Sequence, residues 1–237
     1  MMQRYFAINK EQDKIILEPS DIHHITNVMR MNDGDEIEVV FDSKLYLCCI
    51  VNVKFDIQIS VKKELKFEEK NLEIVLIIPI LKEQKMDYIL QKSTELGVTR
   101  IVPVTTERTL VKLDEKQFLK KKERWIKICK EASEQSKRIT VPTIENMFDL
   151  KGLEKMNGVS IVCSTTTKNS IKKYFQNVKL CDRINIVIGP EGGISEKEEK
   201  YLNQIGFESV SLGDRILRVE TAPLTVLSIL NYINMEW

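Results

Sequence analysis

The chain has 237 residues, of which 43% are hydrophobic and 30% are charged, and its formal net charge is +1. This composition is typical of a soluble globular protein with one large or two small domains. The longest apolar runs, such as residues 74–81, are too short to span a membrane, and the polar N-terminus lacks the hydrophobic region of a signal peptide. We therefore expect a cytoplasmic protein.

The cysteines and histidines argue against metal chemistry. The five cysteines include no C-x-x-C pair, and the two histidines, His23 and His24, are adjacent. Disulfide frameworks and zinc sites need paired or well-spaced ligands, so we expect neither a disulfide framework nor a bound metal.

The first 66 residues predict a small β-barrel. Segments rich in β-branched and aromatic residues are separated by Asp, Asn and Gly turns. Strands are expected at residues 4–8, 36–41, 45–51 and 57–62. Tyr5 and Phe6 are expected in the barrel core, and the charged residues 62–71 are expected to form a linker.

One helix is expected inside this barrel region. Ser20 can cap it, because serine is a preferred residue at the start of a helix. The spacing of its apolar residues predicts a single buried face. That face consists of Ile22, Ile25, Val28 and Met29.

From Leu72 onward, strands alternate with long helices, which predicts a parallel sheet with crossover helices. Strands are expected at residues 72–80, 100–105, 159–164, 184–189 and 208–212. A helix over residues 82–96 is closed by Gly97 at the position where glycine commonly ends helices. An apolar helix over residues 221–233 ends the chain.

A helix within residues 114–138 carries more basic than acidic side chains. Such a run can meet phosphate, although a solvated helix face is its more frequent meaning. The apolar residues of this helix recur at helical spacing and predict a buried stripe. The stripe consists of Phe118, Trp125, Ile126, Cys129 and Ala132.

One loop stands out in this second region. Residues 189–193 read Gly-Pro-Glu-Gly-Gly and join a buried strand to a helix whose start carries a capping box, Ser195 with Glu198. The loop contains neither a dinucleotide fingerprint nor a phosphate loop, so a plain turn is one reading. Ligands in open α/β sheets bind where strands end, and two other strand ends carry loop-like residues, at 164–167 and 213–215. Three such ends could form one pocket.

The same stretches resemble the bacterial small-subunit (16S) ribosomal RNA uridine-N3 methyltransferases of the SPOUT class. The matching motifs are "ILQKSTELGVTRIVPV", "EASEQSKRITVPTI", "IVIGPEGGIS" and "VSLGDRILRVETA", in this order. The N-terminal "RYF" and "HHITNVMR" resemble the PUA-like RNA-binding domain of that family. The resemblance implies an RNA-binding β-barrel over residues 1–70 and an α/β SPOUT domain with a deep trefoil knot over residues 71–237.

The resemblance also implies a cofactor and a set of site residues. S-adenosylmethionine is expected among the knot loops, and the protein is expected to act as a homodimer on 16S ribosomal RNA or the small ribosomal subunit. The resemblance implies that the terminal helix, with Leu227, Leu230 and Ile233, packs across the twofold interface, although this helix could equally cover its own sheet. The implied cofactor residues are Ser164, Thr165, Ile188, Gly189, Pro190, Glu191, Gly192, Gly193, Leu212, Gly213, Ile216, Leu217 and Arg218. The implied RNA-binding residues are Arg4, His24, Arg30, Arg108, Gln135, Lys137 and Arg138.

Three polar residues are implied near the methyl transfer itself. A carboxylate of Glu191 or Glu220 could take the N3 proton of a uridine, and Arg218 could stabilise the uracil anion. The residues leave structural roles open as well: Glu191 could brace its own loop, and Arg218 could pair with Glu220. His24 could equally be a half-buried, hydrogen-bonded residue.

Two other functions remain open at this stage. The first is a SPOUT methyltransferase that acts on another RNA position or on a ribose 2′-hydroxyl. The second is an RNA-binding module without catalysis.

Overall fold

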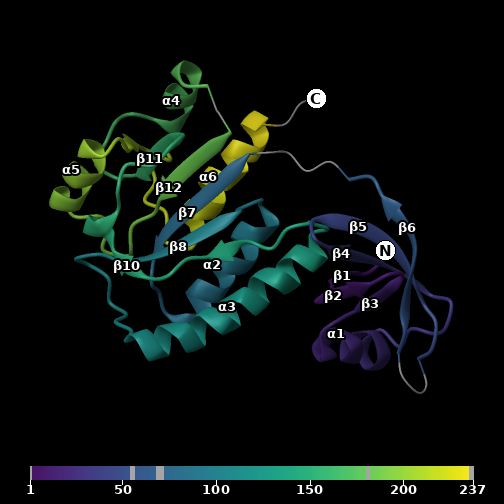
Figure 1. The fold of residues 1–237 in the computed structure, drawn as a ribbon. Helices are drawn as coiled ribbons and strands as arrows, with labels where there is room; N and C mark the ends of the chain where they lie inside the picture. The colour runs from purple at the N-terminus through teal and green to yellow at the C-terminus, as the bar shows by residue number, and fades with distance from the viewer. Residues whose placement is uncertain (1, 54–56, 68–71, 180–181, 235–237) are drawn as a thin grey trace. The chain divides into compact units, whose positions relative to one another are not determined.

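A computed structural model describes residues 2–53, 57–67, 72–179 and 182–234 (Figure 1). The chain forms two compact units. The N-terminal unit comprises Met1–Lys70 together with Ser133–Thr140, and the C-terminal unit comprises Asn71–Ala132 and Val141–Trp237. The segment Ser133–Thr140 therefore belongs with the first 70 residues, although it follows them by more than sixty positions in the chain.

The N-terminal unit is built on a six-stranded sheet with the order β1-β4-β5-β6-β3-β2. Its strands are β1 (Arg4–Phe6), β2 (Asn9–Glu11), β3 (Lys14–Ile16), β4 (Glu36–Phe41), β5 (Lys44–Ile50) and β6 (Ile59–Leu65). The two edge strands, β1 and β2, are consecutive in the chain. Between them, Ala7 donates its N–H to Val40 and Ile8 donates its N–H to Ile16, so the sheet curls into the predicted barrel.

The barrel core is apolar, with Ile25, Ile37 and Ile50 fully buried. Tyr5 is buried as predicted, whereas Phe6 is half-buried. The β2–β3 hairpin was not predicted, because its sequence is mostly polar and carries little alternation. The predicted linker begins too early, since β6 extends to Leu65. Residues 68–71 of that linker lie outside the described residues.

The helical segment of this unit differs from the prediction in two ways. Helix α1 (Pro19–His23) begins after Glu18, so Ser20 lies inside the helix and is not its cap. Proline at the first helical position fixes the start instead. The chain continues as a π-helical turn, η1 (His24–Val28), which widens the helix and turns Val28, 59% exposed, and Met29 toward solvent.

The C-terminal unit contains a parallel sheet of seven strands with the order β10-β8-β7-β12-β11-β13, and β9 pairs with β8. The strands are β7 (Glu73–Pro79), β8 (Arg100–Thr105), β9 (Thr143–Ile144), β10 (Phe148–Asp149), β11 (Val159–Cys163), β12 (Arg183–Val187) and β13 (Glu208–Val210). The helices are α2 (Glu83–Glu95), α3 (Glu115–Gln135), η2 (Leu150–Gly152), α4 (Ile171–Asn177), α5 (Glu196–Gln204) and α6 (Thr221–Asn234). The short elements β9, β10, η2 and α4 were not predicted.

Helices cover both faces of this sheet (Figure 1). On one face, Leu76 and Ile78 of β7 share a core with residues of α2, α3 and α6. On the other face, Val75 and Ile77 share a core with residues of α5 and η2. The central strand is therefore buried on both sides, as its continuous apolar run predicted.

Two apolar predictions in the helices need correction. Ile126 of α3 is 43% exposed and does not belong to the buried stripe, whereas the other four predicted residues are buried. Leu227 and Leu230 of α6 are fully buried within their own chain, so they cannot pack across an interface with a second copy. The capping box of α5 is confirmed, because Ser195 and Glu198 exchange side chain-to-backbone hydrogen bonds.

Candidate functional site

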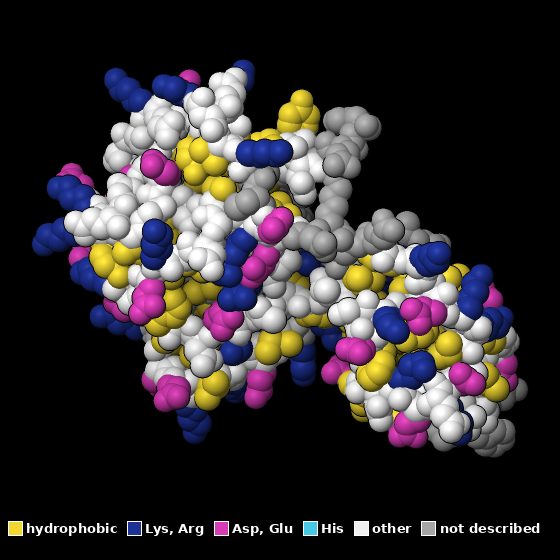
Figure 2. Space-filling model, turned by 45° about the horizontal axis from the view of Figure 1, so that its top comes forward, with side chains coloured by type: hydrophobic (Ala, Val, Ile, Leu, Met, Phe, Trp, Pro, Cys, Tyr) yellow, Lys and Arg dark blue, Asp and Glu magenta, His cyan; other side chains and the backbone are white. Residues whose placement is uncertain are grey.

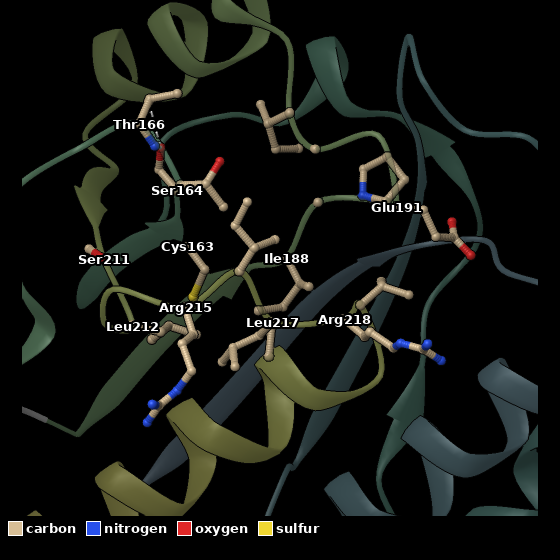
Figure 3. A pocket seen from close by; sticks show the side chains of 18 of the residues that line it. Cys163, Ser164, Thr166, Ile188, Glu191, Ser211, Leu212, Arg215, Leu217 and Arg218 are labelled. Atoms are coloured by element: carbon tan, nitrogen blue, oxygen red, sulfur yellow. Dashed lines mark hydrogen bonds between the residues drawn. The ribbon is translucent and has the colours of Figure 1, made fainter.

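A cavity of about 310 Å³ opens where β11, β12 and β13 end (Figure 3). Three loops line it: residues 164–166 after β11, residues 188–194 after β12, and residues 211–219 after β13. Because these strands are parallel neighbours, their carboxyl ends meet at one edge of the sheet. The predicted convergence of three strand ends on one pocket is confirmed.

The walls combine apolar side chains with a few polar groups. Ile188, Leu212 and Leu217 are the apolar side chains labelled in the close-up of the cavity wall (Figure 3). Cys163 also lines the cavity, and burial raises the pKa of its thiol to about 12. It therefore stays protonated and acts as a small apolar group.

All the predicted cofactor residues except Gly192 line this cavity. Gly192 instead approaches Arg108: a Cβ atom on Gly192 would lie 3.3 Å from the Cβ and Cδ atoms of Arg108. Arg108 also donates a hydrogen bond of 2.6 Å from Nη1 to the Gly192 carbonyl. Gly192 is thus a contact point between two loops, and we remove it from the predicted cavity wall.

The glycines on either side are required by the shape of the loop itself. A Cβ on Gly189 would lie 3.0 Å from the backbone nitrogen of Ile194, and Gly193 has φ +72°. Close approach of a ligand was the predicted reason for these glycines, but the turn alone already accounts for them. Gly213 is different, because it has φ +128° and no atom within 4 Å of the position of a Cβ.

Charged side chains meet at the edge of the same cavity: Lys85 and Glu191 line it, whereas the predicted residue Glu220 lies next to the lining residues and is not one of them. Lys85 of α2 donates from Nζ to Oε1 of Glu191 at 2.8 Å, and the same nitrogen lies 3.6 Å from Oε2 of Glu220. The hydrogen bond from Lys85 holds the pKa of Glu191 below its usual range, and burial opposes this effect. Glu191 therefore braces its loop through Lys85, which supports the structural role foreseen for it.

Arg218 is the most exposed of these charged groups. Its side chain is 84% exposed, and Nη1 lies 3.9 Å from Oε1 of Glu220, beyond hydrogen-bond distance. Figure 3 shows Arg218 and Glu191 on the same side of the cavity and Arg215 on the other. The arrangement leaves the Arg218 guanidinium able to meet an anionic group.

The cavity wall also contains residues outside the predicted cofactor set, among them Lys85, Thr166 and Glu199. Thr166 donates to Glu199 at 3.3 Å and shares a 2.9 Å hydrogen bond with Ser164. Lys85 and Glu191 are 106 residues apart. No local pattern predicts such a contact, because it depends on how the strands are ordered in the sheet.

In the N-terminal unit, two of the predicted RNA-binding arginines are buried. Arg4 donates from Nε to Glu38 at 3.0 Å, and from Nη1 to the carbonyls of Lys137 and Arg138. Arg138 is 7% exposed. Both guanidinium groups therefore serve the packing of this unit, and we withdraw Arg4 and Arg138 as RNA contacts.

The remaining predicted RNA-binding residues are more accessible. Arg30, Arg108 and Gln135 are exposed, whereas Lys137 is only partly exposed and donates from Nζ to Oε2 of Glu38 at 2.9 Å. His24 is half-buried and its Nδ1 lies 2.9 Å from the Tyr5 hydroxyl, which agrees with the structural role left open for it. On the face shown in Figure 2, basic and acidic side chains are interspersed over both units.

Within the described ranges, no group of three or more His, Cys, Asp or Glu side chains is arranged to hold a metal ion. The helices described by the structure also include none that is long and apolar enough to cross a membrane.

Comparisons with known proteins identify the family. The model for an RNA methyltransferase domain matches residues 68–231, and the model for an RNA methyltransferase PUA domain matches residues 17–60. The ribosomal RNA small subunit methyltransferase E of Bacillus subtilis is 36% identical, with 98% of this chain and 96% of that protein covered.

Two solved structures are similar over nearly the whole chain. One is a ribosomal RNA small subunit methyltransferase E from Neisseria gonorrhoeae bound to S-adenosylmethionine, with a TM-score of 0.88, 29% identity and 98% of each chain covered. The other is a putative methyltransferase from Legionella pneumophila in complex with the same cofactor, with a TM-score of 0.89, 29% identity and 98% of each chain covered.

These likenesses confirm the predicted fold class, an α/β domain of the SPOUT type preceded by a small PUA-like barrel. Since the sequence match extends over almost the full length of both proteins, the chain belongs to the ribosomal RNA small subunit methyltransferase E family of RNA methyltransferases.

Proposed function

We propose that this protein transfers a methyl group from S-adenosylmethionine to N3 of one uridine in 16S ribosomal RNA of the small subunit. The observation that carries the proposal is the three-loop cavity at the strand ends, in a chain of this family. The similar structures from N. gonorrhoeae and L. pneumophila bind S-adenosylmethionine, and the similar B. subtilis protein is named for small-subunit ribosomal RNA. This activity belongs in the cytoplasm.

The residues of the cavity suit an adenosine-containing cofactor. Its volume of about 310 Å³ is within the range of small-molecule sites. Ile188 and Leu217 offer apolar surfaces for a flat ring, while Ser164 and Thr165 offer hydroxyls. Gly213 exposes backbone with nothing within 4 Å of its Cβ position, which leaves room for a ligand to approach.

The cofactor, when bound, would supply an electrophilic methyl group on a sulfonium. The protein must then hold the uracil in line with that methyl group and accept its N3 proton. We propose that Arg218, exposed at the cavity, stabilises the negative charge that develops on the uracil. The same side chain lines the cavity, so one residue can touch both reactants.

Glu220 is the better candidate for the proton acceptor. Glu191 already accepts a 2.8 Å hydrogen bond from Lys85 and its pKa is lowered, which weakens it as a base. The cations nearest Glu220 lie at 3.6 and 3.9 Å, and its Oε2 has no hydrogen bond to the described residues. We therefore assign Glu191 to bracing and Glu220 to proton transfer.

We propose that the two parts of the chain have different functions. Residues 1–70 bind RNA, and residues 71–237 carry out the methyl transfer. The match of residues 17–60 to an RNA methyltransferase PUA domain supports this division. Arg30, His24 and Arg108 are the proposed contacts, together with Gln135 and Lys137 near the end of α3. Arginine and lysine side chains at such positions pair with phosphate.

We also propose that the protein works as a homodimer. Fewer residues are available for the interface than the sequence suggested, because Leu227 and Leu230 are buried in their own chain. Tyr232 and Ile233 near the end of α6 are exposed and provide apolar surface for a partner. Sedimentation of the purified protein at micromolar concentration tests this, and a fully active monomer would contradict it.

Nucleoside analysis by mass spectrometry tests the proposed reaction. Ribosomal RNA from a strain lacking this protein should lack N3-methyluridine, and the gene returned on a plasmid should restore it. Loss of a 2′-O-methyl nucleoside instead would support the alternative ribose target. An unchanged nucleoside profile, with RNA binding retained by the purified protein, would favour a non-catalytic RNA-binding module.

A further inference from the structure

Lys85 joins three segments at the cavity that are far apart in the chain. It lies in the first turn of α2, which follows β7, and its ammonium lies 2.8 Å from Glu191 in the loop after β12. The same ammonium lies 3.6 Å from Glu220, in the loop after β13. One cation from a helix thus contacts one carboxylate from each of two cavity loops.

We propose that Lys85 is a positioning residue for methyl transfer: it holds Glu191 and Glu220 in place and thereby leaves Arg218 free to meet the RNA substrate. This inference rests on the proposed function. Lys85 acts on the reacting groups through the two carboxylates.

The balance of charges around Glu220 explains why Lys85 leaves Arg218 free to meet the RNA. Glu220 has two cations near it, Lys85 at 3.6 Å and Arg218 at 3.9 Å. With Lys85 present, Glu220 needs no close contact with Arg218, whose side chain remains 84% exposed. Without Lys85, the guanidinium would be the nearest cation to Glu220 and would be drawn toward it.

The ammonium also keeps the two carboxylates compatible with each other. Two carboxylates around one nitrogen repel each other, and the positive charge on that nitrogen offsets the repulsion. The hydrogen bond with Glu191 raises the pKa of Lys85, so the positive charge is retained at neutral pH. Lys82, at the start of α2, is a further cation that acts on Glu191 at longer range.

The surroundings of Lys85 allow its role to be tested by substitution. Its side chain is partly exposed, and among the described residues its ion-pair partners are Glu191 and Glu220. On the same helix, Lys92 forms a comparable ion pair with Glu95 at 2.8 Å, but it does not line the cavity. Lys92→Gln is therefore a matched control for loss of one lysine from α2.

The test compares Lys85→Gln, Lys85→Arg and Lys92→Gln in the full chain. For each variant we would measure the thermal midpoint, the calorimetric Kd for S-adenosylmethionine, and the single-turnover rate of methyl transfer to small ribosomal subunits from a strain lacking the protein. Lys85→Gln is expected to slow transfer by about 100-fold, because misplaced catalytic groups cost about that much, while Kd changes by less than about threefold.

The Lys85→Arg variant distinguishes a positioning role of Lys85 from a role in the stability of the fold. Lys85→Arg keeps the cation and should recover most of the rate, and Lys92→Gln should behave as wild type. If Lys85→Gln does not fold, Lys85→Met, which keeps the apolar stem, takes its place with the same expected result. A wild-type rate in Lys85→Gln would overturn the inference, as would equal losses of midpoint and cofactor binding in the Gln and Arg variants. If the wild-type protein itself transfers no methyl group, the proposed function fails, and the inference fails with it.

Discussion

Arg218 and Glu220 are two residues apart, yet the guanidinium Nη1 and the carboxylate Oε1 are separated by 3.9 Å, which is too far for a hydrogen bond. The arginine is exposed at the cavity, whereas the carboxylate is mostly covered. This loose pairing places an exposed guanidinium and a mostly covered carboxylate together near the proposed cofactor cavity.

Replacing Arg218 with alanine should slow methyl transfer by about 100-fold, because removing one donor that stabilises developing charge has an effect of this order. The Kd for S-adenosylmethionine should change much less than the transfer rate, because Arg218 lines the cavity but its side chain is 84% exposed. Arg100→Ala is a suitable control, because Arg100 pairs with Glu73 at 3.0 Å and does not line the cavity. An unchanged transfer rate in Arg218→Ala would remove Arg218 from the mechanism.

The loop after β12 offers a contrast between two adjacent glycines. Gly193→Ala should weaken binding of S-adenosylmethionine by up to about 5- to 30-fold, because φ +72° is strained for alanine, at about 1 to 2 kcal/mol, in a residue that lines the cavity. Gly192→Ala should have a smaller effect, since its φ is not in the left-handed region and the contact of 3.3 Å with Arg108 needs a shift of only a few tenths of an ångström. Calorimetric titration of both variants checks this, and equal affinities would refute the distinction.

The buried cluster in the N-terminal unit predicts a dependence of stability on pH. Burial tends to raise the pKa of Glu38, but hydrogen bonds from Lys137 and Arg4 outweigh it and lower that pKa. A lowered pKa means that Glu38 stabilises the fold fully above its unfolded value, about 4.3. This contribution is lost as the pH falls below that value and through the folded-state pKa.

Glu38→Gln should therefore lower the free energy of unfolding by about 2 kcal/mol at neutral pH, and the difference from wild type should shrink in acid. Glu36→Gln is the matched control on the same strand. Glu36 pairs with Lys62 at 2.8 Å, but both side chains are exposed, so this substitution should leave the midpoint nearly unchanged. Denaturant unfolding of both variants across the acid range provides the measurement; a pH-independent difference would contradict the assignment.

Arg30 gives a prediction for RNA binding. It is exposed just after η1, beside the exposed Val28 and Met29. Arg30→Ala should weaken binding to ribosomal RNA and leave cofactor affinity unchanged. The slope of log K against log salt concentration should become smaller in magnitude by about 1, because one phosphate contact is lost. Lys14→Ala, an exposed lysine on β3, is the comparison. Equal RNA affinity and salt slope in the wild type and Arg30→Ala would exclude Arg30 from the interface.

Local patterns predicted the elements with strong periodicity. Strands β4 and β8 lie where the alternation or apolar run placed them, and Ser195 starts α5 as its capping box indicated. The β2–β3 hairpin was missed because polar residues such as Asn9 and Lys14 give no apolar signal. Val28 was placed on the wrong face, because a π-helical turn cannot be recognised from spacing alone.

The site was predictable only in part, because some of its contacts join segments that are far apart in the sequence. The residues of three loops could be assigned from motifs, and the cavity contains nearly all of them. Lys85 could not, since its two carboxylate partners come from distant loops. Burial of Arg4 and Arg138 likewise depends on Ser133–Thr140 joining the barrel. The trefoil knot stays a prediction, because strand order does not by itself determine how the chain is threaded.

The most direct test of the central claim is the position of a transferred label. Purified protein would be incubated with S-adenosylmethionine carrying a deuterated methyl group and with small ribosomal subunits from a strain lacking the protein. The RNA would then be digested to nucleosides and analysed by mass spectrometry. The account predicts deuterated N3-methyluridine, formed about 100-fold more slowly when Arg218→Ala replaces the wild-type protein. Label on a ribose 2′-oxygen or another base, or no label at all, would contradict it.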